Sequence, residues 1–332
     1  MREYLIILLD DTSVSYCHFC NNRTENKLIS IEDLKSGIFY AMKENLMIQY
    51  VLPNYELPAK YKELMNSIDS HLIVPASCAD GNAIDSADVI VFDEWNTLLN
   101  WCFDKHQSYV LRTSKEDYFK NYTKLSIILG KSDRIGLVFT DVDRFVDADF
   151  ERYKLSLETL RATITAEYAN GHFVQFNLLT DRMMLNKMNN CSAGVSNITL
   201  APNGKFYICP AFYYDGDCDG GEVSLNDVCH KGYSIGSLKE GLLIKNPQIY
   251  KLDYAPICRI CDAYHCKRCV WLNRRITFEV NTPSHAQCVM AHIERNAARQ
   301  LLADIRDLGL FLPKQEIKEI DYLDPFDVIK EN

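Results

Sequence analysis

Four cysteines lie close together in the stretch CRICDAYHCKRC, where Cys258, Cys261, Cys266 and Cys269 form two C-x-x-C pairs four residues apart. Paired cysteines on short turns are typical ligands of iron–sulfur clusters, which take up to four thiolates. They are equally typical of structural zinc sites, in which His265 would be a further ligand. These four cysteines alone therefore leave iron–sulfur and zinc chemistry open.

Three more cysteines extend this set. Cys191 and Cys209 flank the segment NITLAPNGKFYI as C-x12-G-x4-C, with Gly204 in the turn, and Cys288 lies further along the chain. Alternating apolar residues around Asn-Gly predict a hairpin over 197–209, which brings its two flanking thiolates together. A single zinc ion cannot use seven thiolates, so the full set favours iron–sulfur clusters.

A further C-x-x-C pair, Cys17 and Cys20, follows the apolar run YLIILL near the start of the chain. Two thiolates that follow a predicted strand either belong to an iron–sulfur site or are the remains of a site that has lost its ligands. Two thiolates leave a four-iron cluster short of ligands.

The composition sets limits on the kind of protein. The chain has 332 residues, a net charge of −9 and thirteen cysteines, nine of them between Cys191 and Cys288. A negative chain is a poor partner for nucleic acid or an anionic membrane, and no apolar run reaches the length of a membrane span. No signal-peptide pattern is present, so we expect a cytoplasmic protein whose cysteines serve a purpose other than disulfides.

The elements that would position these cysteines divide along the chain. Short apolar runs predict strands at 4–9, 47–52, 71–75, 89–93, 109–112, 135–140 and 173–179. Amphipathic helices are expected between most of them, including one that begins after Ser30, with Ile31, Leu34, Ile38, Phe39 and Met42 on its buried face. This alternation predicts a parallel sheet covered by helices, either doubly wound or an open α/β barrel.

The remaining helices are expected at 147–171, ending at Gly171, and at 284–309, capped near Ser284. The stretches at 71–75 and 89–93 could lie outside the main sheet. The first 180 residues, which hold these strands and helices, are too few for a complete eight-fold barrel.

The cysteine pattern as a whole resembles the SPASM domain of radical SAM peptide-modifying enzymes. That domain has C-x9-15-G-x4-C, a gap, C-x2-C-x5-C-x3-C, a gap and a final cysteine. Here CSAGVSNITLAPNGKFYICP matches the first block, and each gap of the second block is one residue shorter. The resemblance implies a partial (β/α)6 barrel at 1–185, a SPASM iron–sulfur module of hairpin and helices at 186–310, and a C-terminal tail at 311–332.

The resemblance also implies two auxiliary [4Fe–4S] clusters. One would be ligated by Cys191, Cys209 and Cys269. A fourth cysteine expected shortly before Cys191 is absent, so the fourth position is open or is filled by Cys218, Cys229 or a non-cysteine group. The ligands of the second cluster would be Cys258, Cys261, Cys266 and Cys288.

In this family the first strand leads into C-x3-C-x-aromatic-C, whose three thiolates hold the cluster that binds S-adenosylmethionine (SAM). The corresponding stretch here is Ser13-x3-Cys17-His-Phe-Cys20, with serine in place of the first cysteine. A serine hydroxyl ionises much less readily than a thiol and is a poor iron ligand. The Gly-Gly-Glu-like turn that binds the SAM amino group is also missing from MIQYVLPNYELPAKY. We therefore expect SAM and its cluster to be absent.

The stretches LIILLDDTSVSYCHF and ENLMIQYVLPNYELP further resemble the CXXX-repeat peptide maturase family. This resemblance implies a partner subunit of an intact radical SAM maturase, acting on a precursor peptide with Cys-x-x-x repeats and installing cross-links such as thioethers. The first strand begins at residue 4, so we expect no small N-terminal leader-binding domain. The alternatives are an active radical SAM enzyme with unusual cluster ligation, and a zinc-ribbon-bearing α/β binding protein without a redox role.

Overall fold

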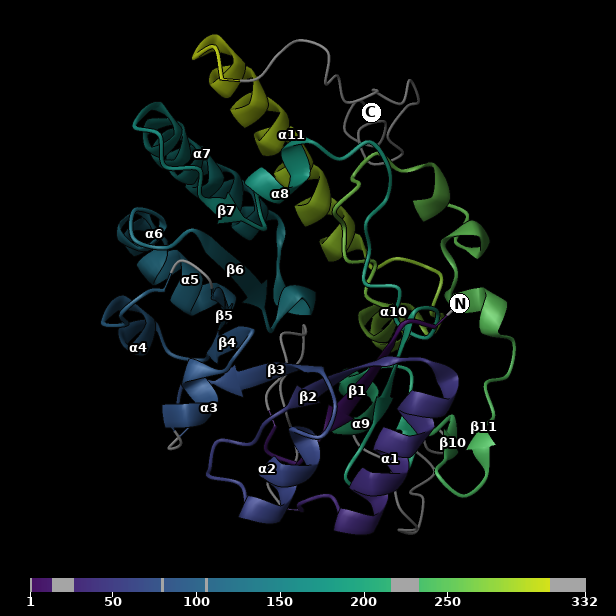
Figure 1. Ribbon diagram of the computed structural model, residues 1–332. Helices are drawn as coiled ribbons and strands as arrows, with labels where there is room; N and C mark the ends of the chain where they lie inside the picture. The colour runs from purple at the N-terminus through teal and green to yellow at the C-terminus, as the bar shows by residue number, and fades with distance from the viewer. Residues whose placement is uncertain (1, 14–26, 79–80, 105–106, 216–232, 311–332) are drawn as a thin grey trace. The chain divides into compact units, whose positions relative to one another are not determined.

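A computed structural model describes residues 2–13, 27–78, 81–104, 107–215 and 233–310 (Figure 1). The expectations for Cys17, Cys20, Cys218, Cys229 and the tail at 311–332 fall outside these residues. The chain forms two compact units, each assembled from separate stretches. Unit 1 comprises 1–93, 107–112 and 192–251, and unit 2 comprises 94–106, 113–191 and 252–332. The sequence boundaries expected at 185/186 and 310/311 stay predictions.

Unit 1 is built on a sheet with the strand order β5-β4-β3-β2-β1-β8-β9. Neighbouring strands run parallel from β5 to β8, and only the β8–β9 pair is antiparallel. A small antiparallel pair, β10–β11, lies in the same unit. The strands are β1 (Tyr4–Leu8), β2 (Met47–Val51), β3 (Ser70–Pro75), β4 (Val89–Phe92), β5 (Ser108–Thr113), β8 (Asn197–Leu200), β9 (Phe206–Tyr207), β10 (Gly236–Ser237) and β11 (Gly241–Leu242).

The predicted hairpin is present, with Gly204 at a positive φ of 74° in its turn. Its first strand, β8, also pairs in parallel with β1, from Tyr4 opposite Asn197 to Ile7 opposite Leu200. Most residues of β1 and β8 are buried, as is typical of strands inside a parallel sheet. The hairpin therefore belongs to the same sheet as the N-terminal strands. The segments at 71–75 and 89–93, whose membership was left open, are strands β3 and β4 of this sheet.

The helices of unit 1 are α1 (Ile31–Glu44), α2 (Ala59–Met65), α3 (Gly81–Asp85), α9 (Pro210–Tyr214) and the 3-10 turn η3 (Pro247–Tyr250). Ser30 caps α1 as predicted, because its hydroxyl accepts the Asp33 N–H at 3.0 Å. The expected buried face was partly wrong: Phe39 and Met42 are exposed. Gly37 faces inward, where a Cβ would come within 2.5 Å of Leu200 Cδ2, so a larger residue would require the buried Leu200 side chain to move.

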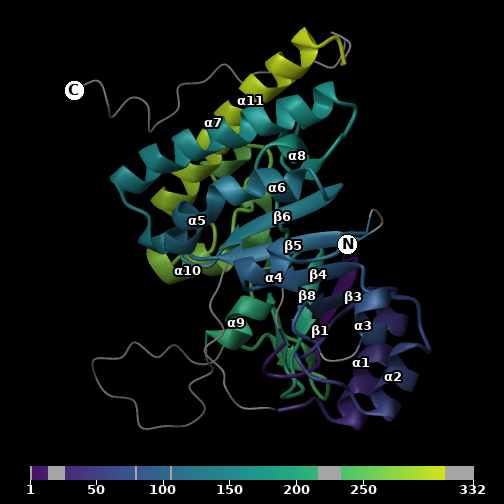
Figure 2. The same ribbon diagram turned by 90° about the vertical axis from the view of Figure 1, so that its left-hand side faces the viewer.

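Unit 2 contains the strands β6 (Arg134–Phe139) and β7 (Gln175–Phe176), which pair in parallel. Its two long helices, α7 (Asp147–Ala169) and α11 (His285–Asp307), lie side by side in both views (Figure 1, Figure 2). The shorter elements are α4 (Trp95–Leu99), α5 (Lys115–Asn121), η1 (Tyr122–Lys124), α6 (Leu125–Leu129), η2 (Val142–Arg144), α8 (Thr180–Met183), η4 (Leu252–Tyr254), η5 (Cys258–Ile260) and α10 (Val270–Thr277).

The ends of the long helices are set by the residues that the sequence indicates. Ser284 caps α11 by accepting the Gln287 N–H, and Gly309 follows its end with a φ of 76°. Gly171 follows α7 with a φ of 81°. Left-handed backbone of this kind after a helix favours glycine. These observations confirm the α/β class, whereas the partial barrel and the SPASM module stay predictions. Among the described helices, none is long and apolar enough to cross a membrane.

Candidate metal centre

The second cysteine block lies in unit 2, on a loop that faces the first half of helix α11. Cys258 opens the 3-10 turn η5, and the loop continues to Cys269, which caps helix α10. Cys288 lies in the first turn of α11, where its N–H bonds to the Ser284 carbonyl at 3.1 Å. The Ser284 cap therefore fixes where Cys288 lies on the helix, opposite the loop.

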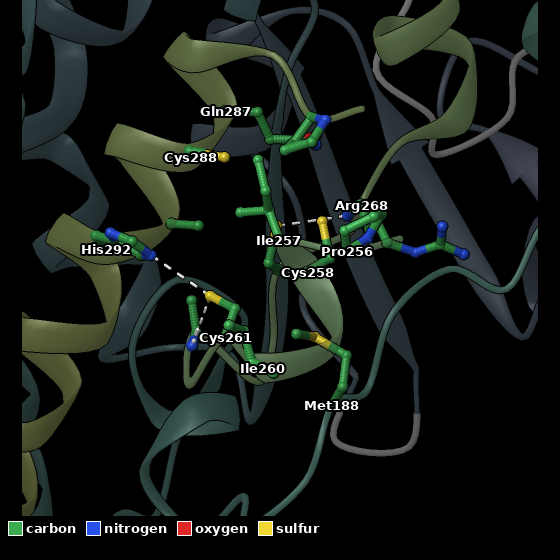
Figure 3. Close-up of a pocket in the computed structure, with 14 residues that line it drawn as sticks. Met188, Pro256, Ile257, Cys258, Ile260, Cys261, Arg268, Gln287, Cys288 and His292 are labelled. Atoms are coloured by element: carbon green, nitrogen blue, oxygen red, sulfur yellow. Dashed lines mark hydrogen bonds between the residues drawn. The ribbon is translucent and has the colours of Figure 1, made fainter. Parts of the chain in front are cut away.

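One cavity of about 330 Å³ is lined by Cys258, Cys261, Cys266 and Cys288 together (Figure 3). Its other walls are mainly apolar and include Met188, Pro256, Ile257, Ile260, Pro283 and Ala291. A cavity of this size is far larger than a single ion needs. The loop and the helix thus bring together four cysteines that are up to thirty positions apart in sequence.

Backbone N–H groups already point at two of these sulfurs. The Ala263 N–H lies 3.4 Å from Cys261 Sγ, and the Arg268 N–H lies 3.4 Å from Cys266 Sγ. Arg268 has a positive φ of 44°, which turns the loop so that its N–H reaches back to Cys266. Donors of this kind stabilise negative charge on thiolates, and they orient the sulfurs before any metal binds.

Burial disfavours negative charge on the thiols of Cys258 and Cys266. It raises the pKa of Cys258 to about 11 and the pKa of Cys266 to about 12, although the nearby Arg268 side chain partly lowers the first and its N–H the second. These cysteines stay protonated at neutral pH unless a cation compensates the thiolate charge. Binding of a metal would therefore release protons from this cavity.

The spacing of the sulfurs bears on which metal fits. In a tetrahedral zinc site with Zn–S bonds of about 2.3 Å, the sulfurs lie about 3.8 Å apart. Among the described residues, no three cysteine sulfurs come within 4.8 Å of one another; the one group that close is Cys261, Asp262 and His292. A four-iron cluster stands between its thiolates and keeps them further apart. The four-cysteine donor set suits either metal centre, but the separation of the sulfurs and the volume of the cavity fit a cluster better than a zinc ion.

Asp262 is not available as a ligand in this arrangement. Its carboxylate forms ion pairs with Arg295 at 2.5 Å and with Arg299 at 2.7 Å, both on helix α11. Burial alone would raise the pKa of Asp262, but the two guanidinium groups outweigh it and hold the pKa below its ordinary value. Asp262 thus ties the cysteine loop to α11.

His292 also lines the cavity, and the sequence reasoning missed it. Its Nε2 lies 3.4 Å from Cys261 Sγ. Cys288 and His292 are four residues apart on α11 and so share one face of the helix. The C-x3-H spacing within a predicted helix is the feature that would have pointed to it.

His265, the histidine considered as a zinc ligand, does not line this cavity. It is buried, and neither ring nitrogen has a hydrogen-bond partner among the described residues. Burial lowers its pKa to about 2, so the ring is neutral. It borders a small cavity of about 20 Å³, which has room for one water molecule.

The other expected site is divided between the two units. Cys191 and Cys269 belong to unit 2, where the Cys191 N–H bonds to the Lys267 carbonyl at 3.2 Å. Cys269 Sγ accepts the Leu272 N–H at 3.5 Å. Cys209 is buried in unit 1, at the start of helix α9. A common metal centre for these three cysteines stays a prediction.

Ser13, at the position of the missing N-terminal cysteine, has a local structural role in unit 1. It is fully buried, and its hydroxyl accepts the Asp10 N–H at 3.1 Å in a turn after β1. The Tyr214 hydroxyl donates to the Ser13 carbonyl at 2.5 Å. Asp10 itself accepts from the Tyr55 hydroxyl at 2.9 Å. These hydrogen bonds hold Ser13 in the turn, with its hydroxyl used by the protein itself.

The residues after strand β2 fill space instead of forming an open glycine turn. Leu52 and Leu57 are buried there, and Tyr55 reaches across to Asp10. The segment after β2 is therefore packed with bulky side chains, and residues 47–61 contain no glycine.

Comparison with known proteins places the fold. No protein-family model matches the chain, and no curated protein is significantly similar in sequence. Among solved structures, the radical SAM enzyme anSMEcpe with bound AdoMet is similar, at a TM-score of 0.59 and 10% identity, covering 95% of this chain and 97% of that one. A second structure of anSMEcpe, with AdoMet and a Cp18Cys peptide, gives 0.59 and 11%, covering 92% and 99%.

A more distant likeness, to Streptococcus suis SuiB bound to the precursor peptide SuiA, has a TM-score of 0.41 and 13% identity, covering 74% of this chain and 65% of that one. It is too remote to carry an argument. The likeness to anSMEcpe extends over nearly the whole of both chains, so this protein shares the fold of anSMEcpe.

Proposed function

We propose that this chain is an iron–sulfur protein that holds two [4Fe–4S] clusters and serves as the partner subunit of a radical SAM peptide maturase. One cluster would be bound by Cys258, Cys261, Cys266 and Cys288, and the other by Cys191, Cys209 and Cys269. The intact maturase would cleave SAM and install cross-links, such as thioethers, on a precursor peptide with Cys-x-x-x repeats. The fold would comprise a partial barrel and a SPASM module, in a cytoplasmic protein.

One observation carries the first of these clusters: among the described residues, four cysteines line one mainly apolar cavity of about 330 Å³. Four thiolates complete the ligand set of a four-iron cluster. Two of the sulfurs already accept backbone N–H groups at 3.4 Å, as cluster thiolates commonly do. When bound, the cluster would supply a one-electron redox centre, and the chain would hold it away from water.

The surroundings of Ser13 support the proposal that this chain has lost the SAM-binding cluster. The Ser13 hydroxyl is buried and accepts the Asp10 N–H, so it would have to break a native hydrogen bond to approach a metal. The segment after β2 also supports this proposal, because Leu52 and Leu57 are buried there and residues 47–61 contain no glycine of the kind that the family's SAM-binding turn uses.

The peptide substrate is supported by the fold alone. The solved structure of anSMEcpe with a Cp18Cys peptide shows that a protein of this fold binds a peptide. For the present chain we propose the precursor peptide as the ligand, held jointly with the maturase.

The partner role is tested by co-expression with a radical SAM maturase encoded beside this chain. A heterodimer on size-exclusion chromatography with multi-angle light scattering is expected under anaerobic conditions. A stable monomer that does not associate with that maturase contradicts the partner role.

A second candidate is an active radical SAM enzyme with unusual cluster ligation, and the likeness to a structure with bound AdoMet favours it. Anaerobic incubation of the isolated chain with SAM and dithionite separates the two. We expect the unaltered chain to form no more 5′-deoxyadenosine than a control without protein. The Ser13→Cys variant is tested in parallel. Formation of 5′-deoxyadenosine by the unaltered chain would establish the second candidate.

A further inference from the structure

His292 lies on helix α11, which also supplies Cys288 to the cysteine cavity. Its Nε2 lies 3.4 Å from Cys261 Sγ, which is hydrogen-bonding distance for a sulfur acceptor (Figure 3). The side chain is half-buried and points from α11 across the cavity wall toward the cysteine loop. Because Cys288 and His292 are one helical turn apart, the helix that places the ligand also places the ring.

His292 lines two hollows of unit 2. One is the cavity of the four cysteines, and the other is a groove of about 720 Å³ lined by residues of α7 and α11. His292 is the single residue common to both sets of lining residues. The imidazole therefore lies between the cysteine cavity and the groove, next to the Cys261 sulfur.

The ring is better placed to donate a hydrogen bond than to bind the metal. Cys258, Cys261, Cys266 and Cys288 already complete the four ligands that a four-iron cluster takes. The nitrogen lies 3.4 Å from the Cys261 sulfur, which also accepts the Ala263 N–H. Asp262, the nearest carboxylate, is held by Arg295 and Arg299.

We propose that His292 is a positioning residue that donates its Nε2–H to the Cys261 thiolate and thereby raises the reduction potential of the cluster held in this cavity. The proposal rests on the proposed function, because it requires the cluster. Reduction adds one electron, from a low-potential donor of the ferredoxin or flavodoxin class, and converts [4Fe–4S]²⁺ to [4Fe–4S]⁺. No bond forms or breaks, and the proton stays on His292.

The physical basis is the charge on the sulfur. The reduced cluster carries one more negative charge, part of which lies on the thiolates, so a donor at Cys261 stabilises the reduced form more than the oxidised form. A charge-assisted hydrogen bond is worth about twice a neutral one. We therefore expect its loss to lower the reduced-to-oxidised ratio at a fixed applied potential by up to about tenfold, or about 59 mV for one electron.

The test is a redox titration of the full chain, followed by electron paramagnetic resonance after anaerobic reconstitution with iron and sulfide. It compares the unaltered chain with His292→Phe, which removes the donor, and His292→Gln, which keeps a side-chain N–H. His285→Phe is the matched control, since His285 lies two turns earlier on α11 and lines the groove but not the cysteine cavity.

A lower potential in His292→Phe, at least partly restored in His292→Gln and unchanged in His285→Phe, supports the proposal. Equal potentials in all four proteins, each loaded with iron, overturn it. A chain that takes up no iron at all overturns the proposed function instead, so the two failures are distinguishable.

A second measurement decides the matter if His292→Phe fails to hold its cluster. In the unaltered chain labelled with ¹⁵N-histidine, the reduced cluster should show a weak ¹⁵N hyperfine coupling that disappears in His292→Gln. The absence of any ¹⁵N coupling contradicts the proposal. A strong coupling of the kind given by a coordinated nitrogen also contradicts it, because His292 would then be a ligand.

Discussion

The Tyr153 hydroxyl on helix α7 donates a hydrogen bond of 2.6 Å to the Glu294 carboxylate on helix α11. Glu294 also forms an ion pair with Arg182 of helix α8, and all three side chains are buried. Burial raises the pKa of Glu294, although Arg182 and Tyr153 partly offset this effect. These contacts hold α11, which supplies Cys288 to the cysteine cavity, against the rest of unit 2.

We expect Glu294→Ala to destabilise the protein by about 3–5 kcal/mol, because it leaves the buried guanidinium of Arg182 without its partner. The free energy of unfolding, measured by urea denaturation, checks this expectation. Gln300→Ala, at an exposed position on the same helix, is the control and should cost less than about 0.5 kcal/mol. A cost below about 1 kcal/mol for Glu294→Ala would show that the contacts do not clamp α11.

Asp262 links the cysteine loop to α11 through Arg295 and Arg299. We expect Asp262→Asn to loosen this link, so that the reconstituted protein loses iron faster to a chelator such as bathophenanthroline. Asp304→Asn is a matched control, because Asp304 pairs with Arg161 near the other end of α11. Equal rates of iron loss in the two variants would argue against a role for Asp262 in holding the loop.

The Lys115–Asp149 ion pair, with an N–O distance of 2.7 Å, makes stability depend on pH. Burial alone would raise the pKa of Asp149, but the hydrogen bonds from Lys115 and from the Val146 N–H lower it below its ordinary value. A lowered pKa contributes stability above the unfolded-state pKa of about 3.9, and that stability is lost as the pH falls through the folded-state pKa.

We therefore expect the melting temperature of Asp149→Asn to fall below that of the unaltered protein at pH 7. The difference between the two proteins should narrow as the pH is lowered below about 4. Thermal melts across this pH range measure it. A difference that stays constant or widens toward low pH would contradict the assignment.

Ser13 has a structural role in a turn, and this can be tested apart from any metal. Ser13→Ala leaves the buried Asp10 N–H without its acceptor and should cost about 1–3 kcal/mol. Its iron content after reconstitution should equal that of the unaltered chain. A loss of iron in Ser13→Ala would mean that the hydroxyl contributes to a cluster site.

The cysteines of the cavity could be anticipated from sequence because C-x-x-C pairs on a short loop are a local pattern. His292 could have been predicted from sequence in the same way, because its spacing from Cys288 is one helical turn. Asp262 was not, because its ion pairs depend on how the loop packs against α11. An acidic residue between cysteines has no distinguishing feature until Arg295 and Arg299 are seen beside it.

Long-range pairing limited the prediction of the fold. The strands and the hairpin were recognised from apolar runs and turn residues, yet the pairing of β8 with β1 joins residues almost two hundred positions apart. The strand expected over 173–179 is only Gln175–Phe176 in the structure, and Phe173 is exposed. Helix α1 turns Gly37 toward Leu200 and leaves Phe39 exposed, which the spacing of its apolar residues did not predict.

Metal analysis of the full chain, purified without oxygen and reconstituted with iron and sulfide, tests the central claim most directly. We expect about eight iron and eight sulfide ions per chain from two four-iron clusters, and about four of each in Cys258→Ala. Cys102→Ala, at an exposed cysteine away from the cavity, should keep the full amount. Stoichiometric zinc without iron, or iron unaffected by Cys258→Ala, would contradict the account.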